Sequence, residues 1–200
     1  DAPLLEEGET EKYTEVSISS VKESVYMHCT RAIEHSLEFG EHGVNLIKGG
    51  DWNDGFNLVG SEKKGESVWL SMFLCTILDK FSDICRHLED NSRADKYEAI
   101  RKTLIQNIDH HCWDGKWYLR AFFDNGDKIG SESSKEAVID SLTQSFSVIS
   151  NMPDEERKNS ALIQALNKLV DYDAGIIKLF TPPFENVSTN PGYVKSYPPG

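Results

Sequence analysis

The segment that most limits the fold of this chain is an almost uninterrupted apolar stretch between Ser67 and Leu78. Its sequence is Ser-Val-Trp-Leu-Ser-Met-Phe-Leu-Cys-Thr-Ile-Leu, and the pattern becomes amphipathic as it continues to about Leu88. A helix that is apolar on nearly every side is stable in water only when other elements cover it. The segment therefore predicts a helix from Glu66 to about Leu88 inside an outer layer of further helices.

Four other segments repeat apolar residues at helical spacing and supply candidates for that outer layer. The predicted helices run from a cap at Ser17 or Ser20, through Val21, to a stop at Gly40; from Ser92 to about His110; from Asp140 to Ser150; and from Pro153, in the first turn, through Leu169.

The segment from Trp113 to Ser131 has a different pattern. Its apolar run Trp117–Phe123 meets the turn Asp124-Asn125-Gly126 and returns through Ile129, which predicts a β-hairpin. Together these segments predict an all-α layered barrel with a small β-hairpin insertion, and they disfavour a doubly wound sheet.

The charge of the chain limits its partners. There are 21 Lys and Arg against 33 Asp and Glu, which gives a net charge of −12 and predicts repulsion from nucleic acid. No apolar run approaches the ~18 residues of a membrane span, and the first ten residues lack the pattern of a signal peptide. The four cysteines, at 29, 75, 85 and 112, form neither a metal motif nor a disulfide framework. We therefore expect free thiols, a cytoplasmic location, and neither nucleic acid nor membrane as a partner of this segment.

The densest cluster of chemically active residues lies between Gly49 and Gly60. It contains Asp51, Trp52, Asn53 and Asp54 among four glycines, which exclude a regular helix. An indole beside carboxylates and amides suits a sugar ring, whose C–H faces stack while its hydroxyls form hydrogen bonds. A calcium-type loop or an Asx-turn connector explains the composition as well, although the Asp-x-Asn-x-Asp-Gly order of a calcium loop is absent.

The same residues carry a resemblance to a known family. The run Gly50-Asp51-Trp52-Asn53-Asp54-Gly55, followed by Val59-Gly60 and Lys64–Leu70, resembles the signature of glycoside hydrolase family 94, the inverting phosphorylases. The similarity covers nearly the whole chain, through Glu41-His42-Gly43, Trp113–Ala121 and Asn190–Lys195. Two runs are more similar to the β-1,2-glucan branch than to the cellobiose branch, namely Ile139–Ser145 and Tyr197-Pro198-Pro199-Gly200.

The resemblance implies a fold and a set of site residues. The fold is an (α/α)₆ barrel, of which residues 1–200 would be a central fragment without its N-terminal and C-terminal parts. Inorganic phosphate would attack the anomeric carbon, so the protein would supply one carboxyl group as general acid, and the family pattern assigns this role to Asp54. Trp52 would be the sugar platform and Asn53 a further substrate contact. Asp51 would bond a hydroxyl, shape the loop or cap a neighbouring turn.

The resemblance also implies the partners of the protein. We expect an oligosaccharide substrate with phosphate as co-substrate, no cofactor, no metal, and a homodimer of the full-length protein. Three functions stay open: phosphorolysis of β-1,2-linked gluco-oligosaccharides, chain-length trimming in a cyclic β-1,2-glucan synthase, and non-catalytic sugar binding. The 200 residues alone are expected to be inactive.

The histidines are weaker candidates. His110-His111-Cys112 could suggest a metal, but adjacent residues on a helix point to different sides, which favours a solvated helix end. His28, His35 and His42 recur every seven residues, yet His42 lies beyond Gly40, which favours ordinary surface or hydrogen-bonded histidines.

Overall fold

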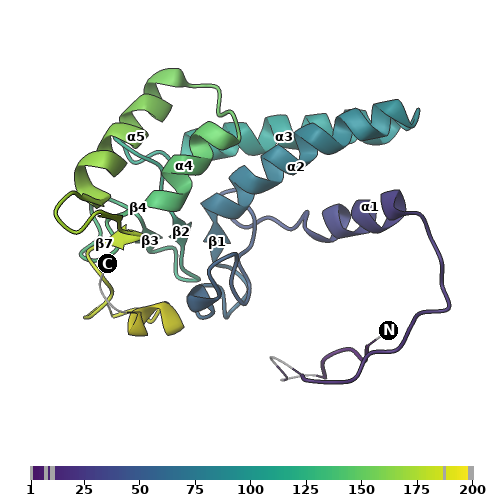
Figure 1. The fold of residues 1–200 in the computed structure, drawn as a ribbon, viewed down its shortest axis with the longest axis horizontal. Helices are drawn as coiled ribbons and strands as arrows, with labels where there is room; N and C mark the ends of the chain where they lie inside the picture. The colour runs from purple at the N-terminus through teal and green to yellow at the C-terminus, as the bar shows by residue number, and fades with distance from the viewer. Residues whose placement is uncertain (1, 7–8, 10–11, 187, 198–200) are drawn as a thin grey trace. The chain divides into compact units, whose positions relative to one another are not determined.

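A computed structural model describes residues 2–6, 9, 12–186 and 188–197 of the chain, and its ribbon is drawn in Figure 1. The chain forms two compact units, Asp1–Leu37 and Glu38–Gly200. Pro198-Pro199-Gly200, part of the run that resembles the β-1,2-glucan branch, lies outside the described residues.

The first unit contains helix α1 (Val25–His35). Its N-cap is Ser24, whose hydroxyl accepts a hydrogen bond from Met27 N at 3.2 Å. The predicted start at Ser17 or Ser20 was therefore too early, and the predicted stop at Gly40 too late. Several serines precede this helix. At Ser24 the backbone is extended and the side chain reaches the Met27 N–H three residues later, as an N-cap requires.

The second unit contains four α-helices among its described residues: α2 (Val68–His87), α3 (Asn91–His111), α4 (Ser141–Ile149) and α5 (Glu155–Leu169). Figure 1 shows α2 and α3 side by side, and α4 contacts both α2 and α5. All four were predicted. Pro153, however, precedes the N-cap of α5, because the Asp154 carboxylate accepts the Arg157 N–H at 3.0 Å and proline has no side-chain acceptor.

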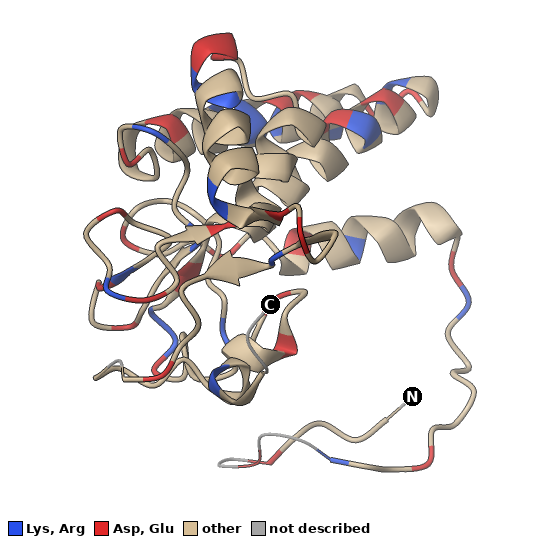
Figure 2. Cartoon of the chain, turned by 60° about the vertical axis from the view of Figure 1, so that its left-hand side comes forward, with Lys and Arg blue, Asp and Glu red and all other residues tan. Residues whose placement is uncertain are grey.

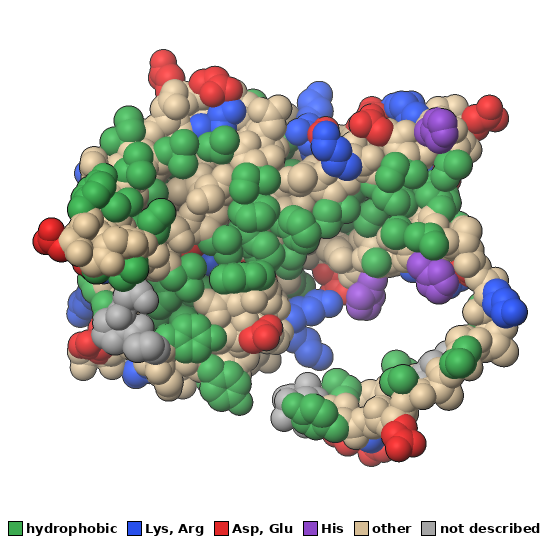
Figure 3. Space-filling model, in the orientation of Figure 1, with side chains coloured by type: hydrophobic (Ala, Val, Ile, Leu, Met, Phe, Trp, Pro, Cys, Tyr) green, Lys and Arg blue, Asp and Glu red, His purple; other side chains and the backbone are tan. Residues whose placement is uncertain are grey.

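Helix α2 is the apolar helix expected from the sequence. Ser67 caps it by accepting a hydrogen bond from Leu70 N at 3.1 Å, and one face is fully buried through Met72, Cys75 and Leu78. Its opposite face is partly uncovered, since Phe73 is 39% exposed. Figure 3 shows hydrophobic side chains gathered over α2 and α4 in this view.

Three short strands form a sheet at the start of α2. Strand β2 (Ala121–Phe122) pairs with β3 (Lys128–Ile129) across the predicted turn, and β1 (Glu66–Ser67), directly before α2, pairs with β2 on its other edge. The expected hairpin is confirmed, but it lies in the core: Trp117 is fully buried and its Nε1–H donates to Gly130 O at 2.8 Å. At Gly130, φ is +86° and a Cβ would lie 2.6 Å from Arg120 N, so glycine is required.

Two further strand pairs join the helices to the C-terminal segment. Strand β4 (Ile139–Asp140) pairs with β7 (Phe180–Thr181), and β5 (Val170–Asp171) pairs with β6 (Ile176–Ile177). Two 3₁₀ turns complete the described residues, η1 (Asp54–Phe56) and η2 (Tyr193–Ser196). The unit is thus mainly helical with two-residue strands, as the all-α prediction requires, while closure into an (α/α)₆ barrel stays a prediction.

Two sequence expectations concern membrane spans and the cysteines. None of the helices in the described residues is long and apolar enough to cross a membrane. None of the four cysteines, all of which lie in described residues, forms a disulfide: Cys75, Cys85 and Cys112 are buried and Cys29 is partly so. Burial raises the pKa of the Cys75 and Cys112 thiols, which keeps both protonated near neutral pH.

Candidate functional site

The Gly49–Gly60 loop is built from nested turns. The Asp51 carboxylate accepts the Asn53 N–H at 2.9 Å, and the Asn53 side chain in turn accepts the Gly55 N–H at 2.9 Å, which starts η1. Phe56, at the end of that turn, is fully buried and anchors the loop in the core. As expected, the loop contains no regular helix beyond this single 3₁₀ turn.

A buried ion pair with Arg120 fixes the Asp51 side chain of this loop. Arg120 Nη1 and Nη2 donate to the two carboxylate oxygens at 2.7 and 2.8 Å, and the Ser67 hydroxyl donates to Oδ2 at 2.5 Å. Both side chains of the pair are shielded, at 0% exposure for Asp51 and 1% for Arg120. Burial alone would raise the pKa of Asp51, but the charge and hydrogen bonds of Arg120 hold it below the ordinary value. These contacts favour the loop-shaping alternative for Asp51, because both of its oxygens already have partners within the protein.

Arg120 faces a second carboxylate and an aromatic ring. Its Nε lies 3.5 Å from Asp140 Oδ2, and its guanidinium carbon lies 4.8 Å from the centre of the Phe56 ring. Asp140 also caps α4, through a 2.7 Å hydrogen bond from Leu142 N. Burial raises the pKa of Asp140 to about 6, although the charge of Arg120 opposes the rise.

Arg120 was not predicted from the sequence as a site residue. The available signal is one charged residue inside the apolar run Trp117–Phe123, because a buried arginine needs a buried acidic partner. That signal gives no indication of which carboxylate the partner is.

Trp52 and Asp54 have the opposite orientation to Asp51 and Asn53. Trp52 is 60% exposed and lies outside the hydrophobic core, and Asp54 is exposed as the first residue of η1. Asn53 is only 5% exposed and serves as the cap of that turn. The loop therefore presents one indole and one carboxylate to solvent, and uses the other carboxylate and the amide to hold its own shape.

The C-terminal segment lies against this loop. The Tyr193 N–H donates to Asn57 Oδ1 at 3.0 Å, and the Tyr197 hydroxyl donates to Asn53 Oδ1 at 3.5 Å. At Gly192, φ is +110° and a Cβ would overlap the Asn57 side chain. The structure thus joins two separate segments that carried the family resemblance, Gly50–Gly60 and Asn190–Tyr197.

His42 forms a second buried polar contact next to β1. Its Nδ1 lies 2.5 Å from Glu66 Oε2, and its ring stacks on Phe122 at a centroid distance of 3.9 Å. Glu66 is only 2% exposed and also accepts the His42 backbone N–H at 3.0 Å. His42 is therefore a hydrogen-bonded histidine, as the sequence favoured.

The other histidines and the cysteines form no metal site in the part of the chain that the structure describes. His110 and His111 are exposed at the end of α3, whereas the adjacent Cys112 is buried. This arrangement agrees with the predicted solvated helix end.

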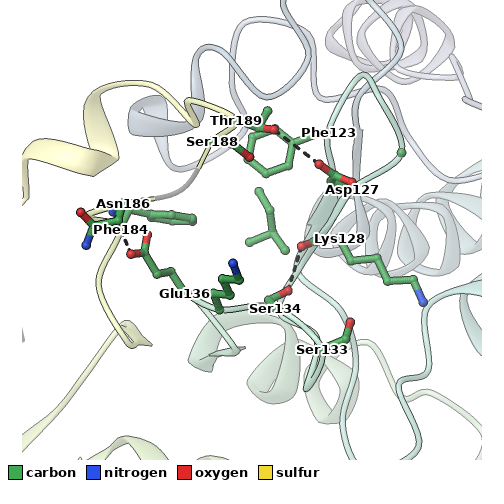
Figure 4. A pocket seen from close by; sticks show the side chains of 13 residues that line it. Phe123, Asp127, Lys128, Ser133, Ser134, Glu136, Phe184, Asn186, Ser188 and Thr189 are labelled. Carbon is green, nitrogen blue, oxygen red and sulfur yellow. Dashed lines mark hydrogen bonds between the residues drawn. The ribbon is translucent and has the colours of Figure 1, made fainter.

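A cavity of about 610 Å³ lies between the β2–β3 hairpin and the C-terminal residues Phe184, Asn186, Ser188 and Thr189. Figure 4 shows its lining side chains. Two of its polar side chains form hydrogen bonds within the lining: Thr189 Oγ1 donates to the Asp127 carboxylate at 3.4 Å, and Ser134 Oγ donates to the backbone carbonyl of Lys128 at 3.0 Å. None of its lining residues belongs to the Gly49–Gly60 loop, so it is separate from the exposed Asp54. Figure 2 shows Lys and Arg dispersed among Asp and Glu over the helices and loops.

The fold and loop define a mainly helical domain that presents an exposed tryptophan and carboxylate on a glycine-rich loop. Residues 1–200 match the catalytic domain of the glycosyl hydrolase 94 superfamily, and the chain belongs to this family.

Relatives of known function fall into two kinds. The chain is 39% identical over 199 residues to the cyclic β-(1,2)-glucan synthase NdvB of Rhizobium meliloti (strain 1021), covering 99% of this chain and 7% of that protein. It is 32% identical over 179 residues to the solabiose phosphorylase of Paenibacillus borealis, covering 88% of this chain and 23% of that enzyme. It is also 32% identical over 142 residues to an N,N'-diacetylchitobiose phosphorylase of Vibrio furnissii, covering 70% of this chain and 17% of that enzyme. The chain thus spans less than a quarter of the length of each of these relatives.

Proposed function

We propose that Asp54 is the general acid of an inverting glycoside phosphorolysis. The Asp54 carboxyl donates its proton to the glycosidic oxygen while a phosphate oxygen attacks the anomeric carbon from the opposite face. The bond between the anomeric carbon and the glycosidic oxygen breaks, and its electron pair goes to the departing sugar. The products are a sugar 1-phosphate of inverted configuration and a shortened saccharide.

The observation that supports this role is that the two loop carboxylates have different environments. Asp51 is wholly shielded and bonded to Arg120, whereas Asp54 is exposed on the same loop two residues after the exposed Trp52. Only Asp54 can therefore face a substrate without breaking an internal ion pair. Trp52 offers the flat apolar surface on which a sugar ring would stack, and Asn53 acts indirectly by holding the turn.

We propose a β-1,2-linked gluco-oligosaccharide as the donor substrate and inorganic phosphate as the nucleophile, with no cofactor. Similarity to disaccharide phosphorylases supports the reaction class, and similarity to NdvB supports the linkage. A second candidate is the trimming of chain length within a cyclic β-1,2-glucan synthase. It is favoured by the 39% identity with NdvB over 199 residues.

The test is Asp54→Asn in the full-length protein, assayed with inorganic phosphate on two glucosides. One is a β-1,2-linked oligoglucoside, and the other carries an activated aryl leaving group that departs without protonation. A general acid should lose ~10²-fold or more in kcat on the first substrate and much less on the second. Asp127→Asn, at an exposed position on the hairpin turn, is the matched control and should leave both rates unchanged.

Equal losses on both substrates would refute the role of Asp54. Sugar binding without phosphorolysis by the wild-type protein would instead favour the non-catalytic module. Product chain lengths separate the two enzymatic candidates, because a trimming domain shortens long β-1,2-glucan chains rather than disaccharides.

A further inference from the structure

We propose that Arg120 is a positioning residue that fixes Asp54 and Trp52 in their exposed orientation. It does so by contacting the loop on both sides of them, at Asp51 and at Phe56. This inference rests on the proposed role of Asp54. Arg120 itself is shielded from solvent at 1% exposure and acts only through its neighbours.

The first contact is the ion pair with Asp51, which precedes the exposed residues in the loop. A guanidinium that donates two parallel hydrogen bonds fixes both the position and the plane of a carboxylate. At Asp51 those bonds measure 2.7 and 2.8 Å, and the carboxylate is held from a third direction by the Ser67 hydroxyl at the start of α2. Asp51 therefore has little freedom to rotate or shift.

The second contact is with the ring of Phe56, which follows the exposed residues in the loop. The Arg120 guanidinium lies 4.8 Å from the ring centre of Phe56, which is fully buried in the core. A cation over an aromatic ring is attracted to its face, and the attraction is stronger when both groups are desolvated. One arginine thus contacts the loop at positions 51 and 56.

Hydrogen bonds within the loop connect these two contacts to the residues between Asp51 and Phe56. Asp51 accepts the Asn53 N–H, and Asn53 accepts the Gly55 N–H, each at 2.9 Å. Asp54 lies between these two bonded residues, so its backbone direction follows from the placement of Asp51 and Phe56. A general acid displaced by about 1 Å from its working geometry can lose ~10²-fold in rate.

The test is Arg120→Lys in the full-length protein. Lysine keeps the positive charge beside Asp51 but cannot form two parallel hydrogen bonds with fixed geometry. We expect kcat to fall about 10- to 100-fold on the β-1,2-linked oligoglucoside and far less on the glucoside with the activated leaving group. This pattern should match that of Asp54→Asn. If Arg120 served only to balance the charge of Asp51, the loss would not depend on the leaving group.

Arg157→Lys is the matched control. Arg157 is a half-buried arginine that pairs with Asp154 at 3.4 Å and lies 5.2 Å from the Trp113 ring, so it shares the contact types of Arg120. It should leave the ratio of rates on the two glucosides unchanged.

Asp51→Asn provides a second measurement if Arg120→Lys does not fold, because it keeps Arg120 and the side-chain shape while weakening the pair. It should show the same dependence on the leaving group. Equal losses on both glucosides, an unchanged kcat, or the unfolding of both variants would overturn the positioning role. A rate that is insensitive to Asp54→Asn would overturn the proposed function instead.

Discussion

Asp140→Asn should change how the stability of the protein depends on pH. Asp140 is fully buried beside Arg120, and burial raises its pKa from the ordinary value of 3.8 to about 6. Between these values the folded state holds a proton that the unfolded state has lost, so the stability contributed by this group falls as pH rises from about 4 to 6. Since each pKa unit corresponds to 1.36 kcal/mol, the full loss is about 3 kcal/mol.

Asparagine imitates the protonated carboxyl and can still accept the Leu142 N–H that Asp140 accepts at 2.7 Å. The free energy of unfolding of Asp140→Asn, relative to wild type, should therefore rise by up to about 3 kcal/mol between pH 4 and pH 7. Urea unfolding at half-unit pH steps, followed by circular dichroism, measures this difference.

Asp124→Asn is a control of opposite sign. The N–H groups of Glu62, Lys64 and Gly65 donate to Asp124, and although burial opposes them, they hold its pKa below the ordinary value. The stability that Asp124 contributes is present above pH 3.8 and is lost as pH falls below that value. A wild-type and an Asp140→Asn curve that run parallel from pH 4 to 7 would refute the assigned role of burial at Asp140.

Two further predictions concern aromatic residues and the exposed face of α2. Trp52→Ala should raise KM for the oligosaccharide and leave the melting temperature nearly unchanged, because Trp52 is 60% exposed; the buried Trp117→Ala should instead cost about 3 to 5 kcal/mol of stability in thermal unfolding. A large drop in melting temperature for Trp52→Ala would place that side chain in the core. The 200-residue chain produced alone should self-associate in size-exclusion chromatography, because Phe73 is 39% and Ile149 is 59% exposed on the apolar face of α2 and α4. It should also release no sugar 1-phosphate, because it spans less than a quarter of the length of its relatives. A monomer that turns over substrate would contradict this prediction.

The four helices and the β2–β3 hairpin of the second unit could be predicted because their signals are local. Ser67 caps α2 three residues before Leu70, and the turn Asp124-Asn125-Gly126 closes the hairpin through neighbours in sequence. The start of α1 was predicted less well, because several nearby serines offer the same local chemistry. Only the backbone conformation at Ser24 distinguishes the serine that caps the helix.

The glycine-rich loop could be recognised from its composition, and Asp54 was assigned from the family pattern. The place of the hairpin in the core could not be recognised, because β1 joins it from 56 residues earlier in the register Glu66↔Phe122. Such non-local pairing leaves no periodic pattern in either segment.

Sequence alone determined which groups this loop offers for chemistry, since two carboxylates, an amide and an indole stand within four positions. Only the tertiary structure decided which carboxylate is held in a buried ion pair and which is exposed. Asp51 and Asp54 are chemically identical side chains, and they differ because a guanidinium 69 residues away pairs with the first while the second faces solvent. The energy of a buried charge depends on its neighbours in space, and the fold sets those neighbours.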